Sequence, residues 1–431
     1  MMSPSSDSSK NAGLTHWKGV NYPFLIFLIL LTQGNILIKP LAFLVIIFVW
    51  PLVPTKIDKN SMGVFYFLMV VYASFSIFTL YGNADNSYLL VYLLGMFFWI
   101  LGLLSFQYIA SFVRHSSSKS IDATIHAFFT FNLIVCGLQL IRLVLLFGGN
   151  PFLNQSSGDH VPGIFTNSSV NFIICSFYIF YFYYKKRYKW AFIAALLCLS
   201  ATYMTGMLIL FLVTGYFVIT SRKIKMIHRV GIAFVGILLL VGFSLASPGN
   251  ILYAKAILNT VTGDNKPRKI QSFIQTAEYI VENPRNFIFG SGMGNFSSRV
   301  AFVADGEYVK WYPREYLYRS KEFSENHFSL WNANLLMDRT QKGTSNQPFS
   351  VYNQMLGEYG MIGFSVLMIY YMGFFFRNFS KLTYSAVLGM LMIGYFTLDY
   401  WFEFYSLTII LEMMALYDLK TYEDRSKAIS S

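Results

Sequence analysis

The stretch SYLLVYLLGMFFWILGLLSFQYIASFV, residues 87–113, contains no charged side chain and is followed by Arg114 and Lys119. A helix of about 20 apolar residues is long enough to cross the hydrocarbon core of a bilayer. Similar stretches recur along the chain of 431 residues, of which 55% are apolar and only 13% are charged. Because soluble domains carry about 25% charged residues, the sequence predicts an all-α polytopic membrane protein.

Twelve apolar stretches are expected to span the membrane. They cover residues 21–32, 36–53, 62–81, 87–113, 121–147, 169–184, 189–200, 203–220, 228–246, 359–377, 381–397 and 402–418. Cys136, Cys175 and Cys198 lie inside such stretches. We therefore expect packing cysteines, without a disulfide or a metal site.

Basic residues mark alternate connections between these stretches, and basic residues in short loops remain on the cytoplasmic side. The loops that carry them hold Lys56 and Lys59; Arg114 and Lys119; Lys185, Lys186, Arg187 and Lys189; Arg222, Lys223, Lys225 and Arg229; Arg377 and Lys381; and, in the tail, Lys420, Arg425 and Lys427. The connections at 82–86, 148–168 and 398–401 contain no Lys or Arg. Both termini are therefore expected inside the cell, and the run 189–220 is expected to turn near 200–203.

This topology divides the chain into five parts. We expect a cytoplasmic tail at 1–20, a bundle of about nine spans at 21–246, a large extracytoplasmic (periplasmic) segment at 247–350, the last spans at 351–418 and a cytoplasmic tail at 419–431. Function is expected in the large segment, since the other connections are short. The net charge of +12 suits lipid headgroups, and no nucleic-acid partner is expected, because no RNA-binding signature accompanies it.

The large segment contains a periodic stretch at 268–282. Its apolar residues recur at a helical spacing and include Ile270, Phe273, Ile274, Tyr279 and Ile280. This spacing predicts an amphipathic helix that lies against the membrane domain.

A glycine-rich turn follows Asn283 and Pro284. It reads FGSGMGNF over residues 289–296 and contains Gly290, Gly292 and Gly294. Glycines at alternate positions allow a tight turn whose backbone N–H groups face an anion. A plain turn is the alternative, because the lysine of a phosphate-binding loop is absent.

A polar helix is predicted where the large segment enters the next span, in PFSVYNQMLGEYGMIG over residues 348–363. Its Glu358 lies at the edge of a membrane helix, where a carboxylate is costly unless it meets water or a partner. Glu358 is therefore either a functional residue or an interfacial cap.

The order of these parts resembles the O-antigen polymerase and O-antigen ligase superfamily. Its members pair an Arg-led helix and a Pro-then-Gly-x-Gly turn with a Leu-x-Glu-x-Gly-x-x-Gly signature that enters a late span. The matching residues are Arg268, Pro284, Gly290 to Gly294, Leu356, Glu358, Gly360 and Gly363. The resemblance implies a class C type glycosyltransferase in the bacterial inner membrane. It would act without metal or cofactor on glycans linked to undecaprenyl pyrophosphate.

Such a transfer needs cations for the pyrophosphate leaving group, and guanidinium groups suit that task. Arg268 is the position that matches the family's loop arginine. Further candidates for binding the pyrophosphate are Arg285, Arg314 and Arg319, because they lie in the large segment, and Arg142, because it lies near the outer end of the fifth span. The alternatives are exposed surface arginines and, for Arg142, a side chain that snorkels to the headgroups.

The acceptor hydroxyl needs a base, and imidazole suits neutral pH. Only His160 and His327 fall on the outer face, and His327 is the candidate base, with a structural histidine as the equal alternative. Glu358 is the second candidate catalytic residue, and Tyr352 and the three glycines are candidate substrate contacts. Asp399 and Glu403 flank the last outer turn and either bind sugar hydroxyls or cap the turn.

Two departures from the ligase pattern bear on the function. Phe349 and Ser350 stand where ligase-like relatives carry a His-Asn pair, and Tyr203 and Met204 where they carry a Ser-Arg pair. We therefore favour a polymerase for O-antigen or capsule polysaccharide, which transfers the growing glycan to a lipid-linked repeat unit. An O-antigen ligase, a flippase or transporter of lipid-linked oligosaccharide, and a sensor or scaffold remain alternatives. Expected partners are the undecaprenyl-pyrophosphate-linked oligosaccharide, membrane lipids and a chain-length regulator.

Overall fold

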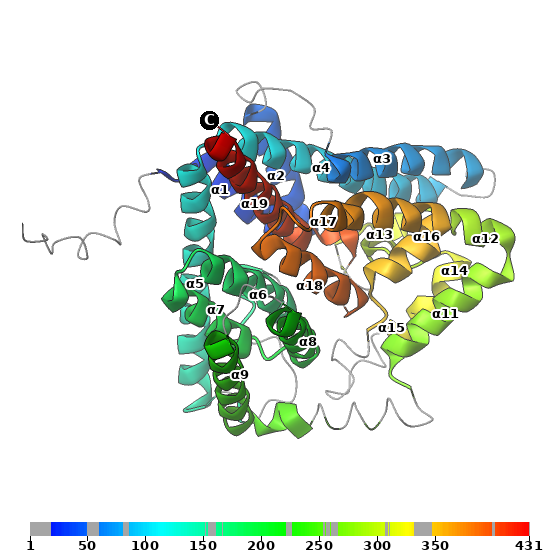
Figure 1. Ribbon diagram of the computed structural model, residues 1–431. Helices are drawn as coiled ribbons and strands as arrows, with labels where there is room; N and C mark the ends of the chain where they lie inside the picture. The colour runs from blue at the N-terminus through cyan, green and yellow to red at the C-terminus, as the bar shows by residue number, and fades with distance from the viewer. Residues whose placement is uncertain are drawn as a thin grey trace, which may run out of the picture.

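The computed structural model describes residues 19–49, 60–80, 86–150, 152–153, 161–165, 167–220, 226–252, 255, 259, 266–306, 309, 311–331, 347–398 and 401–430. Within these ranges the chain folds into helices and forms no strand (Figure 1). The predicted amino-terminal tail lies outside them up to residue 18, as do His160 and Asp399.

The helices follow one another with short connections through most of the chain. They are α1 (Tyr22–Thr32), α2 (Lys39–Val49), α3 (Ser61–Leu80), α4 (Asn86–His115), α5 (Ser118–Phe147), α6 (Ser168–Tyr184), α7 (Tyr188–Ser200), α8 (Met204–Thr220), α9 (Met226–Ala246), α11 (Arg268–Glu282), α12 (Pro284–Phe289), α13 (Arg299–Ala304), α14 (Lys321–Phe323), α15 (Ser329–Trp331), α16 (Val351–Val366), α17 (Gly373–Arg377), α18 (Tyr384–Leu398) and α19 (Ser406–Ser430). Short 3-10 or π turns form η2 (Ile36–Ile38), η5 (Arg314–Tyr316), η6 (Ser324–Phe328), η9 (Leu367–Met372) and η10 (Phe402–Phe404).

Within the described residues, each predicted apolar stretch is helical over most of its length, and the stretch 402–418 is interrupted at Tyr405, between η10 and α19. Four helices are long and apolar enough to cross a membrane, namely Tyr88–His115, Ser118–Phe147, Arg229–Ala246 and Val351–Arg377. The predicted turn near 200–203 is confirmed, since α7 ends at Ser200 and α8 begins at Met204, with Thr202 in the left-handed region at φ 53°.

The last helix, α19, forms the centre of the bundle. Residues 406–417 are buried all round, as expected for a helix that is enclosed by others, and α19 packs on α1, α4, α5, α6 and α18. Its bounds differ from the prediction in two ways. It begins at Ser406, after the η10 turn. It also continues to Ser430, because the charged residues beyond 418 have a high helix propensity and this last part of the helix is exposed. The predicted carboxy-terminal tail is thus helical.

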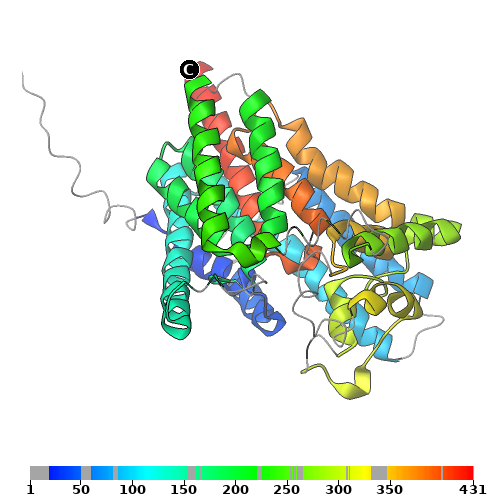
Figure 2. The same cartoon turned by 90° about the horizontal axis from the view of Figure 1, so that it is seen from below.

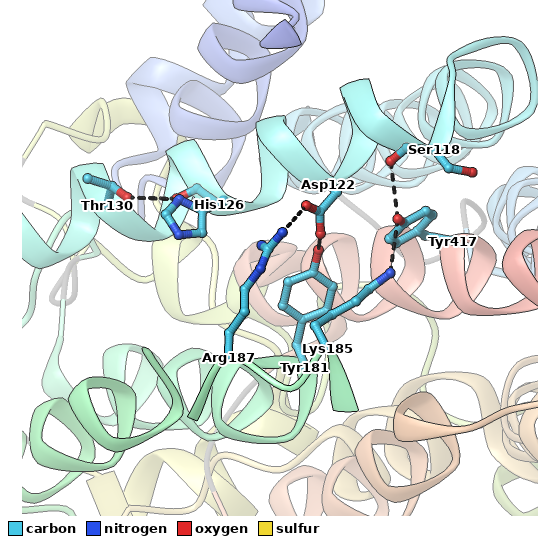
Figure 3. A network of polar contacts seen from close by, with 8 residues as sticks. All are labelled: Ser118, Asp122, His126, Thr130, Tyr181, Lys185, Arg187 and Tyr417. Atoms are coloured by element: carbon cyan, nitrogen blue, oxygen red, sulfur yellow. Dashed lines mark hydrogen bonds and ion pairs between the residues drawn. The ribbon is translucent and has the colours of Figure 1, made fainter. Parts of the chain in front are cut away.

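A polar network joins α5, α6 and α19 at one end of the bundle (Figure 3). Asp122 accepts hydrogen bonds from Arg187 at 2.6 Å and from the hydroxyl of Tyr181. Lys185 donates to the hydroxyl of Tyr417 at 3.0 Å, and this hydroxyl donates to the carbonyl of Ser118 at 3.1 Å. Connections far apart in the sequence are thereby held together at this end.

The short helices of the large segment gather beside α3, α4 and α16, away from α5 and α9 (Figures 1 and 2). The predicted amphipathic helix forms as α11, with its start at Arg268 and its end at Glu282. It packs on α16 as expected, but through its polar face. Lys269, Ser272 and Thr276 are buried, whereas Ile274 and Val281 are exposed.

Candidate functional site

The carboxylate of Glu358 is fully buried and is bound by backbone amides of the glycine-rich turn. Its Oε2 accepts from the N–H of Gly294 at 2.9 Å. Its Oε1 accepts from the N–H groups of Phe296, Ser297 and Ser298 at 3.1, 3.0 and 2.8 Å. Backbone N–H groups that converge in this way form a concave site for an anion. The anion predicted for the glycine turn is therefore a side chain of the protein itself.

The main chains of the two motifs also touch directly. The N–H of Ser291 donates to the carbonyl of Gly357 at 2.8 Å, and the N–H of Gly292 to that of Glu358 at 3.0 Å. We call residues 290–298 and 357–360 together the carboxylate knot. Two segments that the sequence places about sixty residues apart are thus one structural unit.

Two glycines make this contact possible. Gly290 and Gly360 both have positive φ, 71° and 60°, and Gly360 interrupts the helical geometry of α16. A Cβ at Gly290 would lie 2.5 Å from the carbonyl carbon of Glu358, and a Cβ at Gly360 would overlap the carbonyl of Ile288. Only glycine fits both the conformation and the space.

A second buried carboxylate lies next to the knot. Glu403 in η10 accepts from the N–H of Arg299 at 3.0 Å, and the Arg299 guanidinium donates to the carbonyl of Gly34 and lies 4.8 Å from the ring centre of Phe404. Lys39 is buried near Arg299 and donates to the carbonyls of Leu31 and Phe404. Glu403 thus binds the start of α13, which favours a structural role over contact with sugar hydroxyls.

Lys39 and Arg299 were not among the predicted site residues. A lysine inside the apolar stretch 36–53 is itself a signal, because a charge within a membrane span requires a partner or a polar surrounding. For Arg299 the sequence carries no such signal, since it is one of many basic residues in the large segment.

His327, the candidate base, is fully buried behind the knot. Its Nε2 lies 3.2 Å from the carbonyl of Ser272 and 3.1 Å from the hydroxyl of Thr276, and its Nδ1 lies 2.7 Å from the hydroxyl of Ser297. A carbonyl only accepts, so Nε2 carries the hydrogen and Nδ1 accepts from Ser297.

Burial, assisted by the nearby charge of Lys269, lowers the pKa of His327 to about 3. The imidazole is therefore neutral at physiological pH, and it is a poor acceptor of a further proton. This geometry favours a structural role for His327 over the predicted role as base.

Two of the predicted arginines contact one short segment, residues 324–331. Arg268 is half-buried and donates to the carbonyl of Leu330 at 3.3 Å. The Arg319 guanidinium lies 3.6 Å from the ring centre of Phe328, in a cation–π contact. The structure thus brings Arg268 and Arg319 to the same element from different parts of the large segment.

The remaining predicted site residues lie apart from this segment or are engaged elsewhere. Arg285 and Arg314 are exposed on α12 and η5. Arg142 is exposed on α5, which lies on the other side of the molecule from α11 and α12 (Figures 1 and 2). The hydroxyl of Tyr352 donates to the carbonyl of Ile393 at 3.0 Å.

Three of the glycine-turn amides are used within the protein, because those of Gly290, Gly292 and Gly294 donate to Asn286 and to Glu358. This arrangement favours a structural role for the turn over direct contact with substrate. Among the described residues, no group of His, Cys, Asp and Glu side chains is placed to hold a metal ion.

Comparison of the chain with protein-family models, with characterised proteins and with solved structures finds no significant match.

Proposed function

We propose that the chain is a polysaccharide polymerase of the bacterial inner membrane with its active site at the periplasmic face. A hydroxyl of the incoming lipid-linked repeat unit attacks the anomeric carbon of the growing glycan. The new glycosidic C–O bond forms as the bond to undecaprenyl pyrophosphate breaks, and the hydroxyl proton passes to a base. A single displacement inverts the anomeric configuration.

The carboxylate knot carries this proposal. The two motifs that suggested the polymerase and ligase superfamily are distant in sequence, yet Glu358 and the turn from Gly290 to Ser298 are bound to each other by buried hydrogen bonds. Two motifs that matched the family pattern only by chance would not be expected to lie in contact. Their contact supports a shared structural purpose, which is to fix Ser297 against His327 in the segment that Arg268 and Arg319 contact.

The contacts between connections support the alternating topology. The turn at 33–35 meets other connections that are expected outside, since Gln33 donates to the carbonyl of Ile164 at 2.6 Å and Arg299 of the large segment joins Gly34 to Glu403. The connections rich in basic residues meet at Asp122 and Arg187. Each contact joins connections that the positive-inside rule places on the same side.

The two arginines that contact segment 324–331, Arg268 and Arg319, support the leaving-group assignment. A departing pyrophosphate gains negative charge, and guanidinium groups held in place stabilise it without a metal. Arg268 and Arg319 are both held by contacts to this segment. They are the pair that we assign to the pyrophosphate, and Arg285 and Arg314, which are exposed elsewhere in the large segment, are left out of this role.

Complementation of a polymerase-null strain tests the proposal. Arg268→Ala and Arg319→Ala are expected to reach the membrane at normal levels and to abolish chain extension, leaving products of one repeat unit. Arg425→Ala, on the exposed end of α19, is the matched control and is expected to restore full-length polymer. Full-length polymer from both Arg268→Ala and Arg319→Ala would remove these arginines from the mechanism.

The same gel separates polymerase from ligase. Loss of a polymerase leaves one-unit products, whereas loss of a ligase leaves long chains on the lipid carrier. Accumulated long lipid-linked glycan in cells that lack this protein would overturn the polymerase assignment in favour of the ligase.

A further inference from the structure

Helix α11 faces the protein with polar side chains. Lys269, Ser272 and Thr276 recur at a helical spacing and are buried. Asn353 of α16 donates to the hydroxyl of Ser272 at 3.0 Å, and Thr276 contacts His327 at 3.1 Å. The buried side of this helix thus carries these polar groups beside the aromatic Tyr279, whose ring centre lies 4.8 Å from that of Phe296.

The opposite face of α11 is apolar and outward. It is formed by side chains at a helical spacing that are half-buried or exposed, of which Val281 is 77% exposed. They are Ile270, Phe273, Ile274, Ala277 and Val281. The next helix, α12, adds the exposed apolar side chains of Phe287, Ile288 and Phe289. A helix of a protein surrounded by water has the reverse arrangement, with its apolar face toward the core.

The helices next to α12 have exposed apolar side chains of their own. The hydroxyl of Tyr72 on α3 donates to the carbonyl of Phe289 at 2.9 Å, and α12 packs on α16. The outward side chains there are Phe67 and Phe75 on α3 and Ile362 and Ile369 on the helical run of α16 and η9. The run from Val351 to Arg377 is long and apolar enough to cross a membrane. Lipid that surrounds this run therefore lies next to α12, which packs on α16.

We propose that α11 and α12 are seated in the bilayer and that acyl chains of membrane lipids cover their apolar face. The charged residues near the junction of the two helices, Glu278, Glu282 and Arg285, are exposed, as suits the headgroup region that borders an interfacial helix. One helix then separates the bilayer from the buried polar groups at His327. The first part of the large segment belongs to the membrane domain and not to a loop in the aqueous phase.

Spin labelling of the full chain in phospholipid vesicles tests this proposal. Nitroxide is attached at Val281→Cys and Phe287→Cys on the apolar face and at Glu278→Cys as a control on the same helix. The three native cysteines are buried, so the wild-type protein treated in parallel gives the background. Accessibility to oxygen, which concentrates in lipid, is compared with accessibility to a water-soluble nickel chelate.

We expect the ratio of oxygen to nickel accessibility to be several-fold higher at positions 281 and 287 than at 278. Equal ratios at the three positions would place the face in water and overturn the proposal. Low accessibility to both reagents would show a covering protein segment. Spin–spin broadening that disappears on dilution with unlabelled protein would show a second copy, and either result would also overturn it. Elution of each variant as a single folded species in detergent verifies that the labels report on the native fold.

Discussion

Asp122 and Glu358 are two carboxylates in helices of the same bundle, and the protein binds them in different ways. Asp122 pairs with the side chains of Arg187 and Tyr181, and the Asp122 and Arg187 side chains remain 15% and 25% exposed. Glu358 is fully buried and accepts from four backbone N–H groups. The first site depends on which side chains are present, the second on the course of the main chain.

This difference decides what each site tolerates. A side-chain pair with access to water loses little when one partner changes, because solvent replaces it. A buried carboxylate on backbone amides has no such replacement, since its removal leaves the amides without acceptors. The knot is therefore expected to be the more fragile of the two, and substitutions can test that ranking.

Glu358→Ala is expected to have the largest effect. It leaves four buried N–H groups without their acceptor and is expected to destabilise the fold by about 3–5 kcal/mol. The yield of folded protein by size exclusion in detergent and the thermal midpoint measure this loss. Glu358→Gln is expected to lose less, because one oxygen is kept. A thermal midpoint for Glu358→Ala equal to that of the wild type would contradict the claim that the carboxylate knot is the more fragile of the two sites.

The glycines of the knot rank next. Gly290→Ala and Gly360→Ala each place a Cβ against main-chain atoms at positive φ and are expected to cost about 2–4 kcal/mol. Gly137 in α5 has no atom within 4 Å of an added Cβ. Gly137→Ala is therefore the matched control, and it is expected to be neutral or to stabilise the helix by up to about 1 kcal/mol. Similar thermal midpoints for all three variants would show that the close approach is not a constraint.

Asp122→Asn is expected to have a smaller effect. It removes the ion pair with Arg187 at a site that keeps some access to water, so we expect a loss of about 1–2 kcal/mol. Lys321→Ala removes the exposed pair of Lys321 with Glu325, at 3.8 Å, and is expected to change stability by less than about 0.5 kcal/mol. Thermal midpoints in the same detergent rank the two. A loss for Asp122→Asn as large as that for Glu358→Ala would remove the distinction between the two carboxylates.

His327→Gln tests the burial of His327 through the pH dependence of folding stability. The folded protein holds His327 neutral with a pKa of about 3, against an ordinary value of 6.5. Between these values the unfolded chain binds a proton that the folded chain does not, so stability falls as the pH drops below about 6.5. Glutamine has no such titration, and the variant is expected to show a shallower loss of thermal midpoint between pH 6.5 and pH 4. Identical slopes for the two proteins would contradict the buried neutral imidazole.

The helices could be predicted from the sequence because lipid imposes one strong rule. Uncharged apolar runs become helices, and their basic ends alternate, which located the turn at Thr202. The helix at 268–282 was located by the helical spacing of its apolar residues. The same rule could not decide which face of α11 turns inward. In water the apolar face would be buried, and the polar contacts of Ser272 and Thr276 depend on elements distant in the chain.

The site was predicted in part. The sequence left open whether the glycine turn faces an anion or is a plain turn, and whether Glu358 meets water or a partner, and it could not show that each satisfies the other. Such pairing depends on the backbone path between residues 298 and 357, which no local pattern encodes. Lys39 and Arg299 were missed for a related reason, since their acceptors are carbonyl groups of distant turns.

We propose that segment 324–331 and the two arginines that contact it, Arg268 and Arg319, serve the transfer of glycan from undecaprenyl pyrophosphate. Purified protein in vesicles, supplied with synthetic lipid-linked repeat unit, tests it directly. The account predicts a ladder of products from the wild type and from Arg425→Ala, with and without chelator, and no ladder from the double variant Arg268→Ala, Arg319→Ala. A ladder of undiminished length from the double variant, or none from the folded wild-type protein, would contradict it.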